Sequence, residues 1–239
     1  MTVIRIPSSD SDSLFLEGEL NIRKEATGII LFAHGSGSSR HSPRNKYVAE
    51  ILQHDGLATL LVDLLTPKEE ESDRQAQKID YNIPGLVLNK FNISLLAKRL
   101  LSITDWILKS PDTKNLLVGY FGASTGTAAA IVAAAQRSDS NSISVIVSRS
   151  GRPDLAGLDS LSKLRSPVLL IVGGNDNRSV IDLNKNALKQ VGSGKKKLVV
   201  IPNATHLFEE PGTLEEAARI ASGWFRCYFL IRKHNNSEI

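Results

Sequence analysis

A serine flanked by two glycines is the feature of this sequence most typical of an enzyme. Residues 122–126 read Gly-Ala-Ser-Thr-Gly, the G-x-S-x-G pattern in which a serine serves as a nucleophile at a strand-to-helix turn. An ordinary glycine-rich turn with a capping serine would give the same letters. The context favours the nucleophile, because the apolar run Leu116–Phe121 precedes the pattern and the alanine-rich segment Thr127–Gln136 follows it. We therefore expect a strand, a tight turn that exposes the Ser124 hydroxyl, and a helix.

A serine hydroxyl needs a base that accepts its proton, and the base needs a partner that orients it. Among five histidines, His206 alone lies in a loop directly after the last expected strand, and Asp176 follows the expected strand before it. Alone, either residue could be an unremarkable loop or helix-capping residue. The chain order Ser124, Asp176, His206 favours a nucleophile, an orienting acid and a general base gathered at the carboxyl edge of a sheet.

Attack by a serine on a carbonyl group creates an oxyanion that backbone N–H groups must stabilise. The Thr125 N–H follows the serine directly. A second donor is expected from the loop His34-Gly35-Ser36-Gly37, which follows another buried apolar run. We expect the Ser36 N–H to be this donor, with Gly35 as the alternative. His34 is then expected to hold the loop in place rather than to act as a base.

The elements that must position these groups follow from the hydrophobic pattern. Short apolar runs alternate with longer segments of helical periodicity, which predicts an α/β domain with a mostly parallel eight-stranded sheet and helices on both faces. The expected strands are Val3–Ile6, Leu14–Glu19, Gly28–Ala33, Leu57–Leu64, Leu116–Phe121, Ile143–Ser148, Pro167–Val172 and Lys197–Ile201. The expected helices are Pro43–His54, Ile93–Lys109, Thr127–Gln136, Ser179–Val191 and Thr213–Arg232. No linker or repeat divides residues 1–239, so a single domain is expected.

One connection, Thr66–Lys90, is much longer than the usual ~2–6 residues of such loops. It is charged and interrupted by glycine and proline. It leaves the strand Leu57–Leu64 at the same edge as Ser124. We expect a surface excursion that covers the entrance of the site, with a plain disordered loop as the alternative.

The composition is typical of a soluble globular protein, and a cytoplasmic location is expected because the sequence shows no sign of export or of a membrane span. The 239 residues are 41% hydrophobic and 23% charged, which argues against disorder. The net charge of +4 is dispersed, so no nucleic-acid partner is expected. No apolar run approaches the ~18 residues that span a bilayer, and the start of the chain has no secretory leader, so neither a membrane partner nor export is expected. The oligomeric state is left open.

The sequence lacks the residue patterns that disulfide, metal, nucleotide or dinucleotide chemistry would require. The single cysteine, Cys227, cannot form an internal disulfide, and its aromatic neighbours predict a buried thiol. No histidine and carboxylate cluster has the spacing of metal ligands, and neither a P-loop nor a dinucleotide-binding fingerprint is complete. We therefore expect no metal and no cofactor.

With these motifs in this order, the sequence resembles an α/β-hydrolase over almost its whole length. The short expected sheet, the lack of a large cap and the stretch Ala-Thr-His-Leu-Phe-Glu-Glu-Pro-Gly at 204–212 resemble the dienelactone hydrolase family more closely. This resemblance implies hydrolysis of an ester or lactone through an acyl-enzyme, without a cofactor. The founding members use cysteine where Ser124 stands here, so their lactone is not carried over.

The expected function is hydrolysis of a small carboxylic ester, thioester or lactone. The alternatives are an acyltransferase or peptidase that uses the same triad, and a non-catalytic binding protein that retains the fold. An intact set of Ser124, Asp176 and His206 counts against the last alternative.

Four arginines follow expected strands at the same edge. Arg149 and Arg152 come after Ile143–Ser148, while Arg40 and Arg44 leave the His34 loop. Guanidinium groups bind carboxylate or phosphate in bidentate fashion. We therefore expect a small-molecule substrate with an anionic group that contacts Arg149, Arg152 and Arg44. The alternative is that these arginines pair with local carboxylates such as Asp154, or face solvent.

Overall fold

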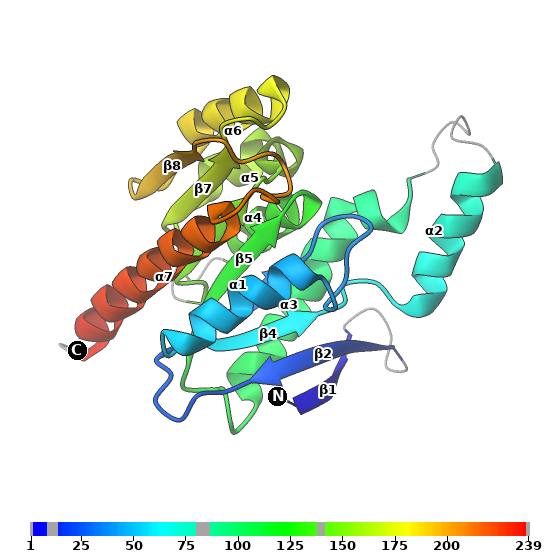
Figure 1. The fold of residues 1–239 in the computed structure, drawn as a ribbon. Helices are drawn as coiled ribbons and strands as arrows, with labels where there is room; N and C mark the ends of the chain where they lie inside the picture. The colour runs from blue at the N-terminus through cyan, green and yellow to red at the C-terminus, as the bar shows by residue number, and fades with distance from the viewer. Residues whose placement is uncertain (1, 9–13, 80–86, 138–141, 238–239) are drawn as a thin grey trace.

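A computed structural model of the chain describes residues 2–8, 14–79, 87–137 and 142–237. Within these ranges, eight strands form one sheet in the order β1-β2-β4-β3-β5-β6-β7-β8 (Figure 1). The strands are β1 (Thr2–Pro7), β2 (Phe15–Asn21), β3 (Gly28–Ala33), β4 (Ala58–Val62), β5 (Leu117–Ala123), β6 (Val145–Arg149), β7 (Val168–Gly173) and β8 (Lys196–Ile201). Strand β2 pairs in antiparallel fashion with both of its neighbours, β1 and β4, and the other pairs are parallel. The predicted mostly parallel sheet is confirmed.

Helices cover both faces of the sheet, as Figure 1 shows. One face carries α1 (Pro43–His54) and α7 (Thr213–Ser237). The other face carries α3 (Ile93–Lys109), α4 (Thr125–Gln136), α5 (Gly157–Lys163) and α6 (Arg178–Gln190). Two short 3₁₀ helices, η1 (Asn89–Phe91) and η2 (Pro153–Ala156), lie in connections. In the described ranges, no helix combines the length and apolarity that a bilayer crossing requires.

The two helical layers explain why the central strands are apolar throughout. Every residue of β3 is buried. Alternate side chains belong to different cores: Ile29 and Leu31 pack under α3 and α4, while Ile30 and Phe32 pack under α1 and α7. Burying each of these side chains contributes about 1.5–3 kcal/mol to the stability of the fold. The sheet is thus a rigid platform for the loops at its edge.

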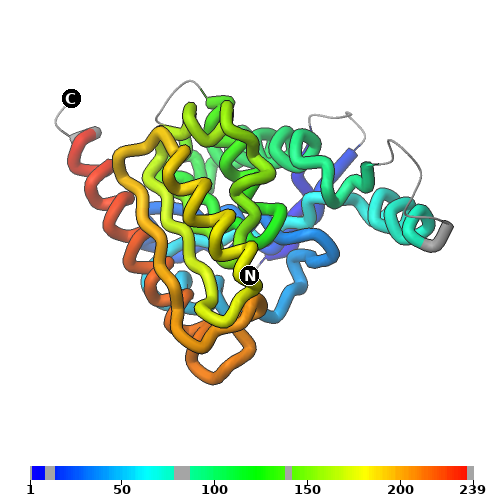
Figure 2. Tube along the Cα trace, turned by 90° about the horizontal axis from the view of Figure 1, so that it is seen from above, coloured from blue at the N-terminus to red at the C-terminus, as the bar shows by residue number. Residues whose placement is uncertain are grey.

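Two α-helices of the described residues, α2 (Pro67–Ile79) and the short α5, are absent from the sequence prediction. The expected excursion 66–90 contains α2, which stands out from the rest of the molecule on the side opposite α7 (Figures 1 and 2). Thr66 and Glu69 form a capping box: the Thr66 N–H donates to Glu69 Oε2 at 2.8 Å, and the Glu69 N–H donates to Thr66 Oγ1 at 3.3 Å. The sequence Thr-Pro-x-Glu was the available signal. Residues 80–86 of the segment lie outside the described ranges.

The expectation of a buried Cys227 is wrong, because this residue is exposed. Phe225 and Phe229 are fully buried and lie one helical turn apart on the inner face of α7. Cys227 lies midway between them along the helix, which turns its side chain to the opposite face.

Candidate active site

Ser124 lies at the tight turn between β5 and α4, as predicted. Its backbone has φ 50° and ψ −125°, a conformation that L-residues rarely adopt. The glycines on both sides are required by close backbone contacts: a Cβ on Gly126 would lie 2.0 Å from the Ala33 carbonyl oxygen, and one on Gly122 would lie 2.6 Å from Thr127 Cα. The turn therefore holds Ser124 in a fixed, strained position at the carboxyl end of β5.

Asp176 and His206 meet although 30 residues separate them. His206 Nδ1 lies 2.9 Å from Asp176 Oδ2 and 3.1 Å from Oδ1. The Asp176 side chain is 1% exposed, whereas that of His206 is 42% exposed. Because the carboxylate accepts the Nδ1 proton, the neutral ring leaves Nε2 unprotonated.

Two further donors fix the Asp176 carboxylate. The Asn177 N–H donates to Oδ1 at 2.7 Å, and Ser150 Oγ donates to Oδ2 at 3.1 Å. Ser150 has φ 43°, another strained position, directly after β6. Sequence reasoning missed Ser150, and no motif in the chain marks it.

Ser124 and His206 line one cavity of about 140 Å³. The loop after β3 lines the same cavity through Gly35 and Ser36, and Arg149 lines it from the end of β6. The structure thus brings the predicted nucleophile and base to one space, with Asp176 behind His206.

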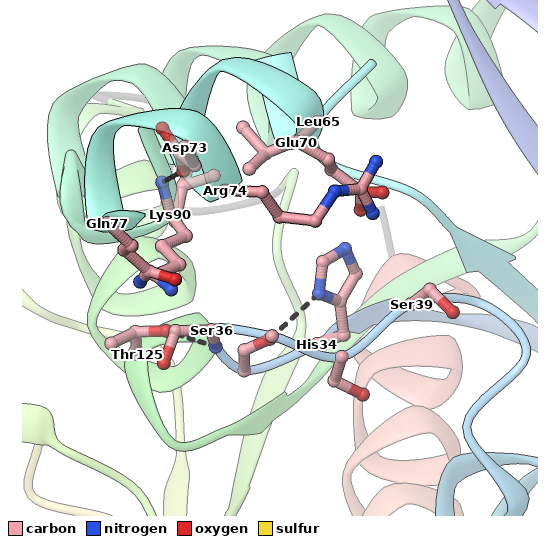
Figure 3. A pocket seen from close by; sticks show the side chains of 14 residues that line it. His34, Ser36, Ser39, Leu65, Glu70, Asp73, Arg74, Gln77, Lys90 and Thr125 are labelled. Atoms are coloured by element: carbon pink, nitrogen blue, oxygen red, sulfur yellow. Dashed lines mark hydrogen bonds between the residues drawn. The ribbon is translucent and has the colours of Figure 1, made fainter. Parts of the chain in front are cut away.

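The loop after β3 presses against the nucleophile. A Cβ on Gly35 would lie 2.8 Å from Ser124 Cβ, so only glycine permits this approach. The Ser36 N–H, the expected oxyanion donor, donates to Thr125 Oγ1 at 2.9 Å (Figure 3). This N–H is engaged here because the loop is tied to the start of α4, and its role as an oxyanion donor stays a prediction.

His34 lies under this loop and is buried. Its Nε2 accepts the Leu64 N–H at 3.0 Å, so the proton is on Nδ1, which donates to the Gly35 carbonyl oxygen at 3.0 Å. Burial lowers the pKa of His34 and outweighs the bond to Gly35, which raises it. A neutral His34 therefore links the end of β4 to the loop, which agrees with the expected supporting role.

The same loop also lines a second cavity, of about 340 Å³ (Figure 3). Helix α2 lines it with Glu70, Asp73, Arg74 and Gln77, and Ser36 and Thr125 line it from the loop and α4. Asp73 is held in place because it accepts the backbone N–H groups of Asn89 and Lys90, both at 2.9 Å.

The predicted substrate-binding arginines separate into two groups. Arg152 pairs with Asp154 at 2.8 Å and lies outside the cavity of Ser124, so the alternative of local pairing holds for it. Arg40 pairs with Asp63 and with Glu17. Arg149 and Arg44 both line the cavity. The structure therefore keeps two of the three expected residues at the site.

Metal ligation finds no support in the described part of the chain, where no three histidine, cysteine or carboxylate side chains gather as a metal site would require.

The sheet order, the turn at Ser124 and the Asp176–His206 pair define an α/β-hydrolase fold, and solved structures agree. Est1E from Butyrivibrio proteoclasticus superposes with a TM-score of 0.73 at 19% identity, over 96% of this chain and 99% of that one.

A dienelactone hydrolase from Anabaena variabilis is 51% identical to this chain, with a TM-score of 0.85, over 95% of this chain and 97% of that one. The chain therefore belongs to the dienelactone hydrolase family. No protein-family model matches it.

A Mycobacterium tuberculosis protein called "Putative phosphoribosyl transferase" is 53% identical over 208 residues, which are 87% of this chain. The match spans only 43% of that relative.

Proposed function

We propose that this protein is a serine hydrolase that cleaves a small carboxylic ester, thioester or lactone through a covalent acyl-enzyme. Ser124 is the nucleophile, His206 the general base and Asp176 the acid that orients it. One observation carries the proposal: the strained Ser124 shares a cavity with His206, whose Nδ1 is bonded to the buried Asp176.

Each step has a group to perform it. His206 Nε2 accepts the proton of Ser124 Oγ while the oxygen attacks the carbonyl carbon. The oxyanion would accept the Thr125 N–H and one N–H of the loop after β3. Gly35 can supply that N–H directly, whereas Ser36 must first leave Thr125 Oγ1. When the resulting tetrahedral intermediate collapses, its bond to the leaving group breaks, and the leaving group takes the proton from His206. Water then repeats the sequence on the acyl-enzyme and releases the acid.

Membership of the dienelactone hydrolase family supports hydrolysis. The mycobacterial relative's name describes a different reaction. The chain spans less than half of that relative, so the name is not carried over to this chain.

A fluorophosphonate probe followed by intact mass measurement tests the proposal. The native protein should gain one probe mass, and Ser124→Ala should gain none. Ser162→Ala, which removes an exposed hydroxyl of α5, is the matched control and should label normally. Absence of labelling in the native protein, or labelling that persists in Ser124→Ala, would overturn the assignment.

The same acyl-enzyme could transfer its acyl group to an alcohol or amine instead of water. Product analysis in the presence of added methanol and glycine distinguishes these reactions. A hydrolase should release mainly free acid, and a transferase mainly the new ester or amide.

We further propose that the segment 66–90 borders the entrance of the site. Helix α2 supports this proposal because it shares a cavity with Ser36 and Thr125. Limited proteolysis between 66 and 90 should slow when the probe is bound at Ser124. Cleavage that the probe does not change would argue for a plain surface loop.

A further inference from the structure

Arg149 is a buried cation that makes no hydrogen bond and no ion pair in the described part of the protein. The residue is 6% exposed, and its Nε and Nη1 atoms are buried and make no hydrogen bond there. Arg40 and Arg152 at the same edge are both paired with carboxylates. An unpaired buried guanidinium is unfavourable for the fold, so its retention needs a reason outside the fold.

The position of Arg149 gives that reason. In the sheet, it pairs in register with Ala123, the residue before the nucleophile. Its guanidinium carbon lies 5.7 Å from the centre of the Phe208 ring, which supports the group from one side. The residue lines the cavity that contains Ser124 and His206.

The cavity is positive on a second side. Arg44 and Asn45, in the first turn of α1, line it too, so the positive end of this helix lies at the cavity. Burial and the charge of Arg44 lower the pKa of Arg149 to about 10, which leaves it charged at neutral pH.

The nearby carboxylates do not neutralise this charge. Glu209 reaches only Arg44, at 3.9 Å, and is 65% exposed. Asp176 is engaged by His206.

We infer that this cavity binds an anionic group of the substrate, a carboxylate or a phosphate, through Arg149, with Arg44 as the second charge. The inference rests on the proposed function and names the substrate class of that site. The volume of about 140 Å³ lies well below the ~300–1,000 Å³ of drug-sized sites. The anion therefore lies a few atoms from the scissile carbonyl, as in a half-ester of a short dicarboxylic acid.

Kinetics with two matched esters test the inference. Nitrophenyl hemiglutarate and nitrophenyl valerate have acyl chains of the same length and differ in the terminal carboxylate. Arg149→Gln should lower kcat/KM for the hemiglutarate by about 10–100-fold, the usual range for a lost charged hydrogen bond. It should change the valerate rate less than about 3-fold. Arg152→Gln is the control and should affect neither ester. An equal loss on both esters would overturn the inference.

Binding without turnover separates this inference from the proposed function. In Ser124→Ala, glutarate or inorganic phosphate should bind in calorimetry, and adding Arg149→Gln should abolish binding. Tighter binding of glutarate identifies a carboxylate site, and tighter binding of phosphate identifies a phosphate site. Failure of both to bind overturns the inference, even if Ser124 reacts with the fluorophosphonate probe. Binding in a protein that the probe does not label overturns the hydrolase and leaves the anion site.

Thermal unfolding tests whether Arg149 is instead structural. Because it makes no hydrogen bond within the described protein, Arg149→Met should keep or raise the Tm. A clear fall in Tm, together with unselective loss of activity, would show a role in folding and overturn the inference.

Discussion

Replacing Asp176 with asparagine should change which nitrogen of His206 carries the proton. In the native protein, Oδ1 accepts the Asn177 N–H at 2.7 Å, and Oδ2 accepts His206 Nδ1 at 2.9 Å. The Asn177 N–H requires an oxygen, so the amide NH₂ must take the place of Oδ2. A donor at that place forces Nδ1 to become an acceptor. The ring proton then lies on Nε2, the atom that must accept the proton of Ser124.

The expected loss in kcat is about 10⁴-fold, as in other serine triads with a wrong tautomer. This factor corresponds to about 5.4 kcal/mol of lost transition-state stabilisation, at ~1.36 kcal/mol for each tenfold change. Stability should change little, because the Asn177 bond remains and the Ser150 hydroxyl can accept where it previously donated.

The assay compares kcat on a nitrophenyl ester and the rate of fluorophosphonate labelling, with thermal unfolding as the check on folding. Asp182→Asn, which neutralises an exposed carboxylate of α6, is the matched control and should behave as the native protein. A folded Asp176→Asn variant whose kcat lies within tenfold of the native value would refute the tautomer argument.

Three more predictions follow from single contacts. Gly126→Ala should lower the free energy of unfolding, measured by urea denaturation, by about 1–3 kcal/mol, because the added Cβ meets the Ala33 carbonyl oxygen. In the control Gly223→Ala, in α7, the added Cβ meets no atom, and the free energy of unfolding should rise by about 0.5–1 kcal/mol. Equal effects of the two substitutions would contradict this prediction. Thr125→Val should lower kcat several-fold, because the Ser36 N–H loses its hydrogen bond to Thr125 Oγ1. Thr125→Ser keeps a hydroxyl at this place and should have the native kcat. An unchanged kcat in the valine variant would show that this hydrogen bond is dispensable. Burial raises the pKa of Glu69, but the hydrogen bonds from Arg99 and Thr66 outweigh burial and hold this pKa below its usual 4.5. The stability that the Glu69 carboxylate contributes above about pH 4.5 should therefore be lost as the pH falls. Glu69→Gln should flatten the acid side of a profile of Tm against pH, and an unaltered profile would count against this prediction.

The strands could be predicted from the sequence because their burial on both faces makes them continuously apolar. The observed β3 has the predicted bounds, Gly28–Ala33. Helix α2 could not be found in this way, since it packs few apolar residues and is held by polar contacts. Its Glu69 pairs with the buried Arg99 of α3, 30 residues away, at 2.6 Å. Pairs of this kind leave no periodic signal.

The same distinction holds at the site. Ser124, Asp176 and His206 could be placed together because each follows a parallel strand, and the carboxyl ends of parallel strands share one edge. Which arginine stays unpaired could not be predicted. Arg152 finds Asp154 two residues away, whereas the partner of Arg40, Asp63, comes from another strand end. Arg149 is unpaired only because no carboxylate of the described chain folds next to it.

The energetically unfavourable features of this fold, strained backbone conformations and a buried charge, lie at the edge of the sheet that bears the site. In the described residues, the non-glycine positions with positive φ are Ser124, Ser150, Asn203 and Phe208, and all lie in loops that leave β5, β6 or β8 at their carboxyl ends. Each such conformation costs on the order of 1–3 kcal/mol, and persists only where the surroundings enforce it. The buried charge of Arg149 adds a further cost at the same edge. None of these features helps the protein to fold, yet Ser124 is the proposed nucleophile, Ser150 holds Asp176, and Phe208 supports Arg149. The apolar sheet beneath them supplies the stability that keeps these groups in place.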